Sequence, residues 1–167
     1  DVEFEVEVCG MFQQDTIVNN ISFQRITIPG GGRTNVAGEP EIPYIRQMIA
    51  VPECDSVALS VNVTNSTTMQ NYKIYPAPAL VEVTHPDSSV TLEEEFSYDT
   101  IAYSTNLYNP QVNAEIHSFG YFRDQKYAEI YIYPVQFNPA TEEIYVNKEY
   151  EITLTFFNSF STVNVNV

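Results

Sequence analysis

The sequence predicts a nearly all-β domain, built as a sandwich or a barrel. The first observation is composition, because the chain has 12 Tyr and 10 Phe, and 44% of its residues are hydrophobic. Aromatic and β-branched residues suit the half-buried surface of a pleated sheet. The second is that short apolar runs alternate with turn residues along the chain, without a helix of ordinary length. The third is length, because 167 residues suit one domain with one core.

The first half of the chain contains four expected strands. Residues 2–8 place Val and Phe on one face and Glu on the other. A second strand is expected over residues 16–28 and a short third strand over 45–51. Residues 57–63 alternate Val or Leu with Ala, Ser and Asn, which indicates a fourth strand with one buried face.

The middle of the chain is its least regular part. Residues 70–86 hold two short apolar runs around a Tyr-Pro-Ala-Pro sequence, and Glu93–Glu95 are interpreted as an acidic, solvated turn. A Tyr- and Asn-rich stretch then continues to Gln111. A long span with so little pattern predicts an extended surface excursion, and such excursions often carry function.

The last third of the chain regains a clear strand pattern. Strands are expected over residues 116–122 and 127–137, joined by a hairpin turn at 124–126. The final strand is long, and its alternate residues from 144 to 156 are apolar, with only Lys148 out of pattern. Residues 158–167 are polar and are interpreted as a linker or a final edge strand.

Residues 133–141, Tyr-Pro-Val-Gln-Phe-Asn-Pro-Ala-Thr, interrupt this pattern. Pro134 has no amide hydrogen, so a strand that contains it must end, bulge or lie at an edge. Apolar residues fall on even numbers before Pro134 and on odd numbers after it, and this change of phase predicts a β-bulge. Asn138 followed by Pro139 is typical of the start of a turn.

The charge of the chain excludes some classes of function. Its 7 basic and 22 acidic residues give a net charge of −15, which repels nucleic acid and anionic lipid. No apolar run approaches the ~20 residues that a membrane-spanning helix needs. Strand pattern begins directly at Asp1, so we expect that any signal peptide was removed or never existed.

The residue types that carry chemistry are few, and no catalytic residue, metal site or cofactor is predicted. Cys9 and Cys54 allow either a disulfide or two separate thiols, and the position of Cys9 on a polar strand face favours separate thiols. His85 and His117 have no second ligand at metal-binding spacing. The many carboxylates follow no Asp-x-Asp-x-Asp-Gly calcium motif, although calcium binding by the acidic surface stays open.

Two segments together resemble one protein family. Gly38-Glu-Pro-Glu-Ile-Pro43 precedes a short strand that ends at Ile49-Ala-Val-Pro52, and the Tyr133–Thr141 segment follows later in the chain. In this order and spacing they resemble the N-terminal propeptide of gingipain-type cysteine peptidases, the clostripain-related C25 family. Ile42 and Phe137 replace a leucine and a tyrosine of the family pattern. The resemblance extends from Val2 to Phe157, and the residues that carry it are Gly38, Pro40, Pro43, Pro52, Pro134, Gln136, Asn138 and Pro139.

The resemblance implies a fold and a role. It implies an antiparallel, jelly-roll-like β-sandwich over residues 1–157 with long loop excursions, followed by the polar tail at 158–167. Its partner would be a cysteine peptidase catalytic domain downstream in the same precursor. The domain would be a non-catalytic, monomeric propeptide that helps the peptidase fold and covers its active-site cleft until it is cut away. It would be exported through the periplasm to the cell surface or medium, commonly by the type IX route of Bacteroidetes.

The same resemblance points to one segment as the inhibitory contact. The excursion that blocks the cleft should follow Tyr75-Pro76 within 77–89, and its predicted contact residues are Leu80, Val81, Glu82, Val83 and Thr84. The segment contains no Arg or Lys, which a pocket selective for basic side chains would need. The peptidase would then prefer other residues, or be blocked by bulk, or be inactive.

Two other interpretations stay open at this stage. Tyr98, Tyr103 and Tyr108 are nearly evenly spaced, and exposed aromatic rings serve as stacking platforms for sugars. This pattern would suit a secreted module that binds a glycan or a protein without any peptidase partner. A third interpretation is a purely structural domain at the start of a larger secreted protein.

Overall fold

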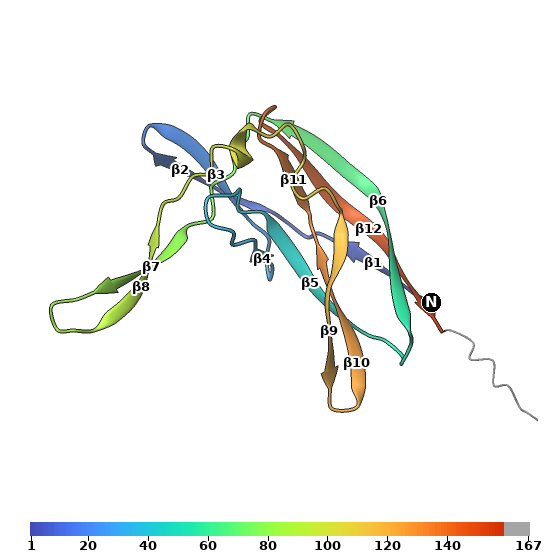
Figure 1. Ribbon diagram of the computed structural model, residues 1–167. Helices are drawn as coiled ribbons and strands as arrows, with labels where there is room; N and C mark the ends of the chain where they lie inside the picture. Colours follow the sequence, from blue (N-terminus) through green and yellow to red (C-terminus); the bar gives the residue numbers. More distant parts are fainter. Residues whose placement is uncertain (159–167) are drawn as a thin grey trace, which may run out of the picture.

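The computed structural model describes residues 1–158, and two antiparallel sheets with two attached hairpins account for their strands (Figure 1). In the first sheet the long central strand pairs with one strand along its whole length on one side and with two shorter strands on the other. The strands of this sheet are β1 (Val2–Glu7), β6 (Ser56–Gln70), β11 (Val135–Asn138) and the central β12 (Glu143–Phe157).

The second sheet has four strands in a simple order. They are, from edge to edge, β4 (Gly32–Arg33), β5 (Pro43–Ala50), β10 (Gln125–Ile132) and β9 (Ala114–Phe122). Glu129 pairs with Ser118 but Ile130 pairs with Ile116, so His117 is an extra residue in β9 at this point. The two sheets confirm the all-β sandwich that was expected.

The core has two parts. Between the sheets, β10 and β12 turn their apolar residues toward each other, and Ala128, Ile130, Ile132, Tyr150, Ile152 and Leu154 are all at most 1% exposed. The second part is a cluster of buried residues that includes Phe23 and, from β11, Phe137. Burial of this kind stabilises a fold by about 25 cal/mol per Å² of apolar surface, so these two clusters provide most of the driving force for folding.

The chain crosses from one sheet to the other at Tyr133-Pro134. Ile132 is the last residue of β10 in the second sheet, and Val135 is the first residue of β11 in the first sheet. The predicted bulge at Pro134 is therefore wrong. The change of phase in the sequence has a different cause. The chain passes from one sheet to the other, so even-numbered residues face the core before the crossing and odd-numbered apolar residues face it afterwards. A residue without an amide hydrogen suits the crossing point, where the ladder of hydrogen bonds stops.

The predicted single strand over 16–28 is also wrong, because this part of the chain is a hairpin. Its strands are β2 (Phe12–Val18) and β3 (Ile21–Thr27), and they pair with each other. Asn19 and Asn20 form the turn with φ angles of 51° and 63°. Asn tolerates this left-handed conformation better than most residues, and two such residues make the tight turn that matches the twist of a hairpin.

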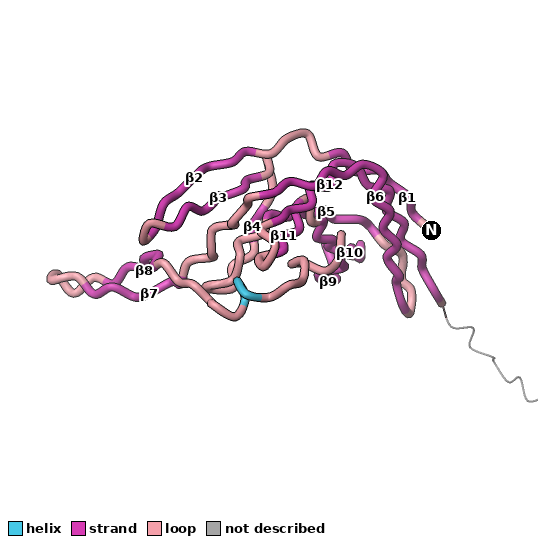
Figure 2. Tube along the Cα trace, turned by 90° about the horizontal axis from the view of Figure 1, so that it is seen from above, coloured by secondary structure: helices cyan, strands magenta, loops and turns pink. Residues whose placement is uncertain are grey.

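The weakly patterned middle of the chain forms a second hairpin. Its strands are β7 (Ala79–Thr84) and β8 (Val90–Glu95). The predicted loop at 77–89 is thus mostly strand and turn, and Glu93–Glu95 lie in a strand rather than in a turn. Figures 1 and 2 show this hairpin extending away from the sheets, at the end of the molecule opposite the N-terminus.

Residues 96–113 return from this hairpin to the sandwich without a strand of their own. Their regular structure is a single short 3₁₀ helix, η1 (Ala102–Ser104), and the peptide bond between Asn109 and Pro110 is cis. The predicted excursion up to Gln111 is confirmed in this part. No helix among residues 1–158 is long and apolar enough to span a membrane.

The C-terminal strand matches the sequence pattern closely. Asn147 pairs with Ser66 and Glu149 with Asn65, so Lys148 is an extra residue between two paired positions. This explains why Lys148 breaks the apolar alternation. β12 ends at Phe157, and the predicted polar tail lies outside the described residues except for Asn158.

Candidate functional site

The β7–β8 hairpin carries the residues predicted to contact a cleft, and it is exposed on both faces. Leu80, Glu82 and Thr84 are exposed, whereas Val81 and Val83 are half-buried on the opposite face. Every residue of β8 is exposed. Among the described residues, neither strand pairs with a third strand. A two-stranded hairpin buries little by itself, so this one offers two faces and two free edges to another molecule.

One face of the hairpin mixes apolar and acidic side chains in a regular way. Leu80 pairs across the strands with Glu94, and Glu82 pairs with Leu92. The two leucines therefore lie on one diagonal and the two glutamates on the other. Leu80 and Leu92 are each 67% exposed, and Val90 at the end of the same face is 58% exposed. Exposed apolar side chains gathered on one face mark a surface suited to a partner. We call this face, made of Leu80, Glu82, Thr84, Val90, Leu92 and Glu94, the outer hairpin face.

The tip of the hairpin is a tight turn fixed by its own hydrogen bonds. The Ser88 amide donates to the His85 carbonyl over 2.9 Å, with Pro86 at the second turn position and Ser88 at a φ of 66°. Asp87 accepts hydrogen bonds from the hydroxyl and the amide of Ser89, and these bonds lower the pKa of its carboxyl. The turn sequence His-Pro-Asp-Ser was the signal in the sequence that could have identified this hairpin.

The first family segment fixes the base of the hairpin. The Gly38 amide donates to the Ala77 carbonyl over 2.8 Å, and the Gly38 carbonyl accepts from the Asp99 amide over 3.0 Å. Ala77 leads into β7 and Asp99 follows β8, so Gly38 bridges both roots. Its φ is +86°, and a Cβ there would lie 3.0 Å from the Asp99 nitrogen. Only glycine combines this backbone conformation with such a close approach. Pro40, two residues on, forms a bridge with Pro76.

A buried carboxylate lies directly beside this base. Glu41 is 6% exposed and accepts two hydrogen bonds from the Arg25 guanidinium, at 2.9 and 3.3 Å, and one from Arg33 at 3.4 Å. The bonds to Glu41 raise the pKa of Arg25, although partial burial opposes the shift. Arg25 also lies 4.7 Å over the ring of Tyr75, immediately before the hairpin. A buried charge held by two partners is satisfied, so Glu41 is a structural group here.

Aromatic rings continue this base into the core. Phe23 lies within 6.4 Å of four other rings, and Tyr103 lies 6.3 Å from Phe137 of β11. The Tyr103 hydroxyl donates to the Ile74 carbonyl, and burial raises the pKa of this phenol. The rings of this cluster are Phe23, Tyr75, Phe96, Tyr98, Tyr103 and Phe137. They connect the hairpin to the buried core.

The second family segment, Tyr133–Thr141, holds residues 96–113, the return segment that follows the hairpin. Gln136 is buried, and its Nε2 donates to the carbonyls of Pro110 and Val112 at 3.1 and 3.2 Å. Asn138 is also buried and donates to Asn106 Oδ1 over 3.0 Å. The backbones of Phe137 and Asn109 exchange hydrogen bonds in both directions. Sequence reasoning treated these residues as markers of a turn. In the structure they hold the return segment against β11.

The remaining family residues have simpler positions. Pro43 begins β5 and pairs with Arg33, Pro52 follows β5, Pro134 lies at the crossing between the sheets, and Pro139 lies in the turn after β11. The turn is closed by Asn138, whose Oδ1 accepts from the Ala140 amide over 3.1 Å. The predicted turn at Asn138-Pro139 is confirmed.

The tyrosines proposed as a sugar-stacking platform do not form one. Tyr98 and Tyr103 stack on each other at 4.4 Å within the aromatic base, and Tyr103 is buried. Tyr108 stacks on Tyr145 at the same distance. A pocket on the second sheet is lined by other rings, but there Tyr131 lies between Tyr44 and His117, at 4.2 and 4.0 Å. The three proposed tyrosines therefore belong to two separate ring pairs and do not form one row.

The other candidate groups lie apart from each other. Cys9 is exposed and Cys54 half-buried, and both are free thiols. His85 contacts Thr91 in the hairpin, whereas His117 lies in β9. Within residues 1–158, no group of three or more His, Cys, Asp or Glu side chains is arranged to hold a metal ion.

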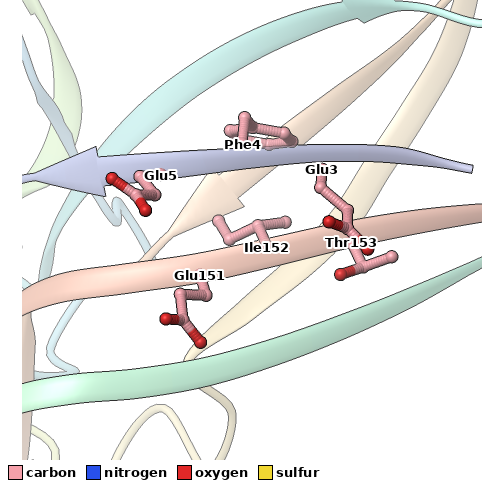
Figure 3. Close-up of a pocket in the computed structure, with 6 residues that line it drawn as sticks. All are labelled: Glu3, Phe4, Glu5, Glu151, Ile152 and Thr153. Carbon is pink, nitrogen blue, oxygen red and sulfur yellow. The ribbon is translucent and has the colours of Figure 1, made fainter.

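A pocket over the first sheet has three glutamates among its six lining residues. Figure 3 shows Glu3 and Glu5 on β1 and Glu151 on β12, together with Phe4, Ile152 and Thr153. Glu5 pairs directly with Glu151, and Glu7 with Glu149. The Asn62 and Asn65 side chains of β6 donate to Glu151 and Glu149. We call Glu3, Glu5, Glu7, Glu149 and Glu151 the acidic stripe, and its carboxylates form a solvated strand face, as predicted.

Comparisons with known proteins agree with this arrangement. The chain is 28% identical to Lys-gingipain of Porphyromonas gingivalis strains HG66 and W83 over 139 residues, which is 81% of this chain and 8% of each relative. The chain therefore spans a small part of the curated relatives that it matches. A solved structure of the complex between the pro- and mature domains of P. gingivalis RgpB matches with a TM-score of 0.75 at 18% identity, over 96% of this chain and 84% of the other.

A second solved structure, from work on the zymogenic latency of gingipain K of P. gingivalis, matches with a TM-score of 0.63 at 22% identity. It covers 92% of this chain and 86% of the other. These structural matches establish the likeness of fold. The family model Propeptide_C25 matches residues 1–166, nearly the whole chain. The chain belongs to the C25 propeptide family, and it is a non-catalytic propeptide domain.

Proposed function

We propose that this propeptide is an intramolecular chaperone and inhibitor of a cysteine peptidase domain in the same precursor, and that the β7–β8 hairpin covers the active-site cleft. The observation that carries the proposal is the hairpin itself. It is exposed on both faces, pairs with no third strand among the described residues, and extends from the body (Figure 1). A strand with a free edge can bind a partner by pairing with an exposed strand of that partner, as many peptide ligands do.

The rigid base of the hairpin supports an inhibitory role. A flexible segment loses conformational entropy when it binds, and this loss weakens the complex. Here Gly38, the Glu41 ion pairs and the aromatic cluster fix both roots of the hairpin before any partner is present. A pre-organised arm of this kind suits tight and specific contact. The domain would act as one copy per peptidase, outside the cytoplasm, as its family resemblance implies.

The test is inhibition of the mature peptidase domain by the separately expressed propeptide. Replacing Leu80–Thr84 with a Gly-Ser sequence should abolish inhibition and leave the melting temperature nearly unchanged, because these five residues contribute little to the core. The matched control replaces residues 121–125, five exposed residues at the tip of the β9–β10 hairpin. This control should inhibit like the original domain. Unaltered inhibition by the Leu80–Thr84 variant would refute the contact, and the absence of any complex at micromolar concentration would refute the function.

The chaperone role needs its own experiment. The mature peptidase domain, unfolded and then diluted, should regain more activity when the propeptide is present during refolding and is removed afterwards. The Leu80–Thr84 variant separates the two roles, because the two sheets of the sandwich are unchanged in it. Equal recovery of activity with and without the propeptide would contradict the chaperone role and leave inhibition standing.

A further inference from the structure

The hairpin is strongly and uniformly acidic. Its carboxylates are Glu82, Asp87, Glu93, Glu94 and Glu95. Between Lys73 and Arg123 the sequence has no lysine or arginine, so neither the hairpin nor the segment 96–113 that follows it carries one. Arg25 interacts with Glu94, but its hydrogen bonds are made to Glu41. The hairpin therefore presents negative charge, and the one group in it that could act as a counter-charge is His85, whose Nε2 lies 4.0 Å from Glu93 and is charged only when the ring is protonated.

Apolar and acidic groups share the outer hairpin face, and this combination restricts the partner. Leu80, Val90 and Leu92 stabilise a complex only if the partner removes them from water. The glutamates on the same face would then be desolvated as well. A desolvated carboxylate is costly unless a cation or several hydrogen-bond donors pair with it. A partner that accepts this face must therefore offer apolar surface and positive charge side by side.

We propose that the hairpin docks in a cleft with an apolar floor and a rim of lysine or arginine residues on the peptidase domain. This inference rests on the proposed function and adds the chemistry of the partner surface. Glu82 and Glu94 meet the rim on the outer hairpin face, and Glu93 and Glu95 meet it on the opposite face. Complementary charge speeds association and makes it sensitive to salt. A pocket selective for arginine or lysine would find no matching side chain in the hairpin, so the leucines and not a cation occupy the cleft.

The acidic stripe supplies a matched control within the same molecule. Like the hairpin, it carries several exposed carboxylates, and Glu3, Glu5 and Glu7 lie on the first strand of the sandwich. Unlike the outer hairpin face, the stripe has no apolar side chains among its carboxylates, because the apolar residues of β1, Val2, Phe4 and Val6, lie on the other face of the strand and pack against the core. Replacing three glutamates with glutamine in either region changes the net charge of the domain by the same amount. Only the position of the lost charge differs.

The experiment measures binding of the propeptide to the mature peptidase domain at about 50 mM and about 300 mM salt. The hairpin variant carries E82Q, E93Q and E95Q, and the control carries E3Q, E5Q and E7Q. Glu94 is left in place because it interacts with Arg25. At low salt the hairpin variant should associate about tenfold more slowly than the original domain and lose most of the salt dependence, because steering by a charged patch contributes effects of this size. The control should change by less than about threefold.

The outcomes separate this inference from the function on which it rests. If the original domain forms no complex, the proposed function fails. If the complex forms but the hairpin variant binds like the control, the basic rim is refuted while inhibition stands. Self-association of the propeptide alone that is lost in a Leu80→Ala, Leu92→Ala variant would also overturn the inference, because a second copy would then occupy the outer hairpin face.

Discussion

The sandwich and the β7–β8 hairpin use similar residues in opposite ways. Ile152 and Leu154 in the sandwich are at most 1% exposed, whereas Leu80 and Leu92 in the hairpin are 67% exposed. Both regions alternate apolar and polar residues along their strands. The difference is that β12 pairs on both sides and is covered by a second sheet, while the hairpin has neither. Burial stabilises a region, and exposure leaves its apolar residues available to a partner.

This contrast implies that stability and binding can be changed separately. The sandwich should determine the free energy of unfolding, and the hairpin should determine affinity for the peptidase. The base of the hairpin belongs to both regions, because Glu41, Gly38 and the aromatic rings contact the core and also fix the roots of the arm. Changes in the core, in the base and in the arm should therefore have decreasing effects on stability.

The largest expected effect is the loss of a core ring. Phe137 is fully buried and lies between β12 and Tyr103. Phe137→Ala should lower the free energy of unfolding by about 3–5 kcal/mol, because it removes buried surface and leaves a cavity. Leu92→Ala in the hairpin removes an exposed side chain and should cost less than about 0.5 kcal/mol. Urea denaturation measures both. A similar cost for the two variants would contradict the division between body and arm.

A smaller effect is expected at the base of the hairpin. Glu41→Gln removes the negative charge that pairs with Arg25 and Arg33 and should cost about 2 kcal/mol, since the arginines stay partly solvated. Glu39→Gln, two residues away, makes the same change of charge at a partly exposed site and should cost less than about 0.5 kcal/mol. Thermal unfolding of the two variants measures the difference. Equal melting temperatures would show that the Glu41 ion pairs do not stabilise the base of the hairpin.

The smallest effect is expected from alkaline pH, and it should be confined to the body. Burial raises the pKa of Tyr103, Tyr133 and Tyr150 above the usual value of 10.0, and the hairpin contains no tyrosine. A raised pKa in the folded state means that stability is complete below pH 10 and is lost as the pH rises above it. The urea midpoint should therefore begin to fall as the pH rises above 10. Tyr150→Phe should make this fall less steep, whereas Tyr121→Phe, an exposed position, should not. A flat profile would count against burial of these phenols.

The strands of the body could be predicted from the sequence because their pattern is local. Alternation of apolar residues located β1, β6 and β12, and even Lys148 stood out as the residue that breaks the pattern. Pro134 was located as a break, but a change of phase does not distinguish a bulge from a crossing between two sheets. That distinction depends on which strands pair, and pairing joins residues far apart in the sequence.

The contact at Leu80–Thr84 stays a prediction, and what the structure changes is the expected shape of this segment, which is a strand and not a loop. The family resemblance suggested the contact at Leu80–Thr84, yet the segment looked like a loop because β7 is at most half-buried on one face and β8 is exposed throughout, so neither strand has a buried face that would reveal it. The turn at His85-Pro86-Asp87-Ser88 was a usable local signal. The roles of Gly38, Gln136 and Asn138 could not be inferred, because each bonds to atoms of distant residues that only the folded chain brings near.

Hydrogen–deuterium exchange of the propeptide, with and without the mature peptidase domain, tests the central claim most directly. If the hairpin is the binding arm and the sandwich its support, the peptidase should slow exchange most at the amides of residues 79–95. The amides of β1 and β12 along the acidic stripe should exchange at the same rate in both states. Protection along β1 and β12 with an unchanged hairpin would contradict the account.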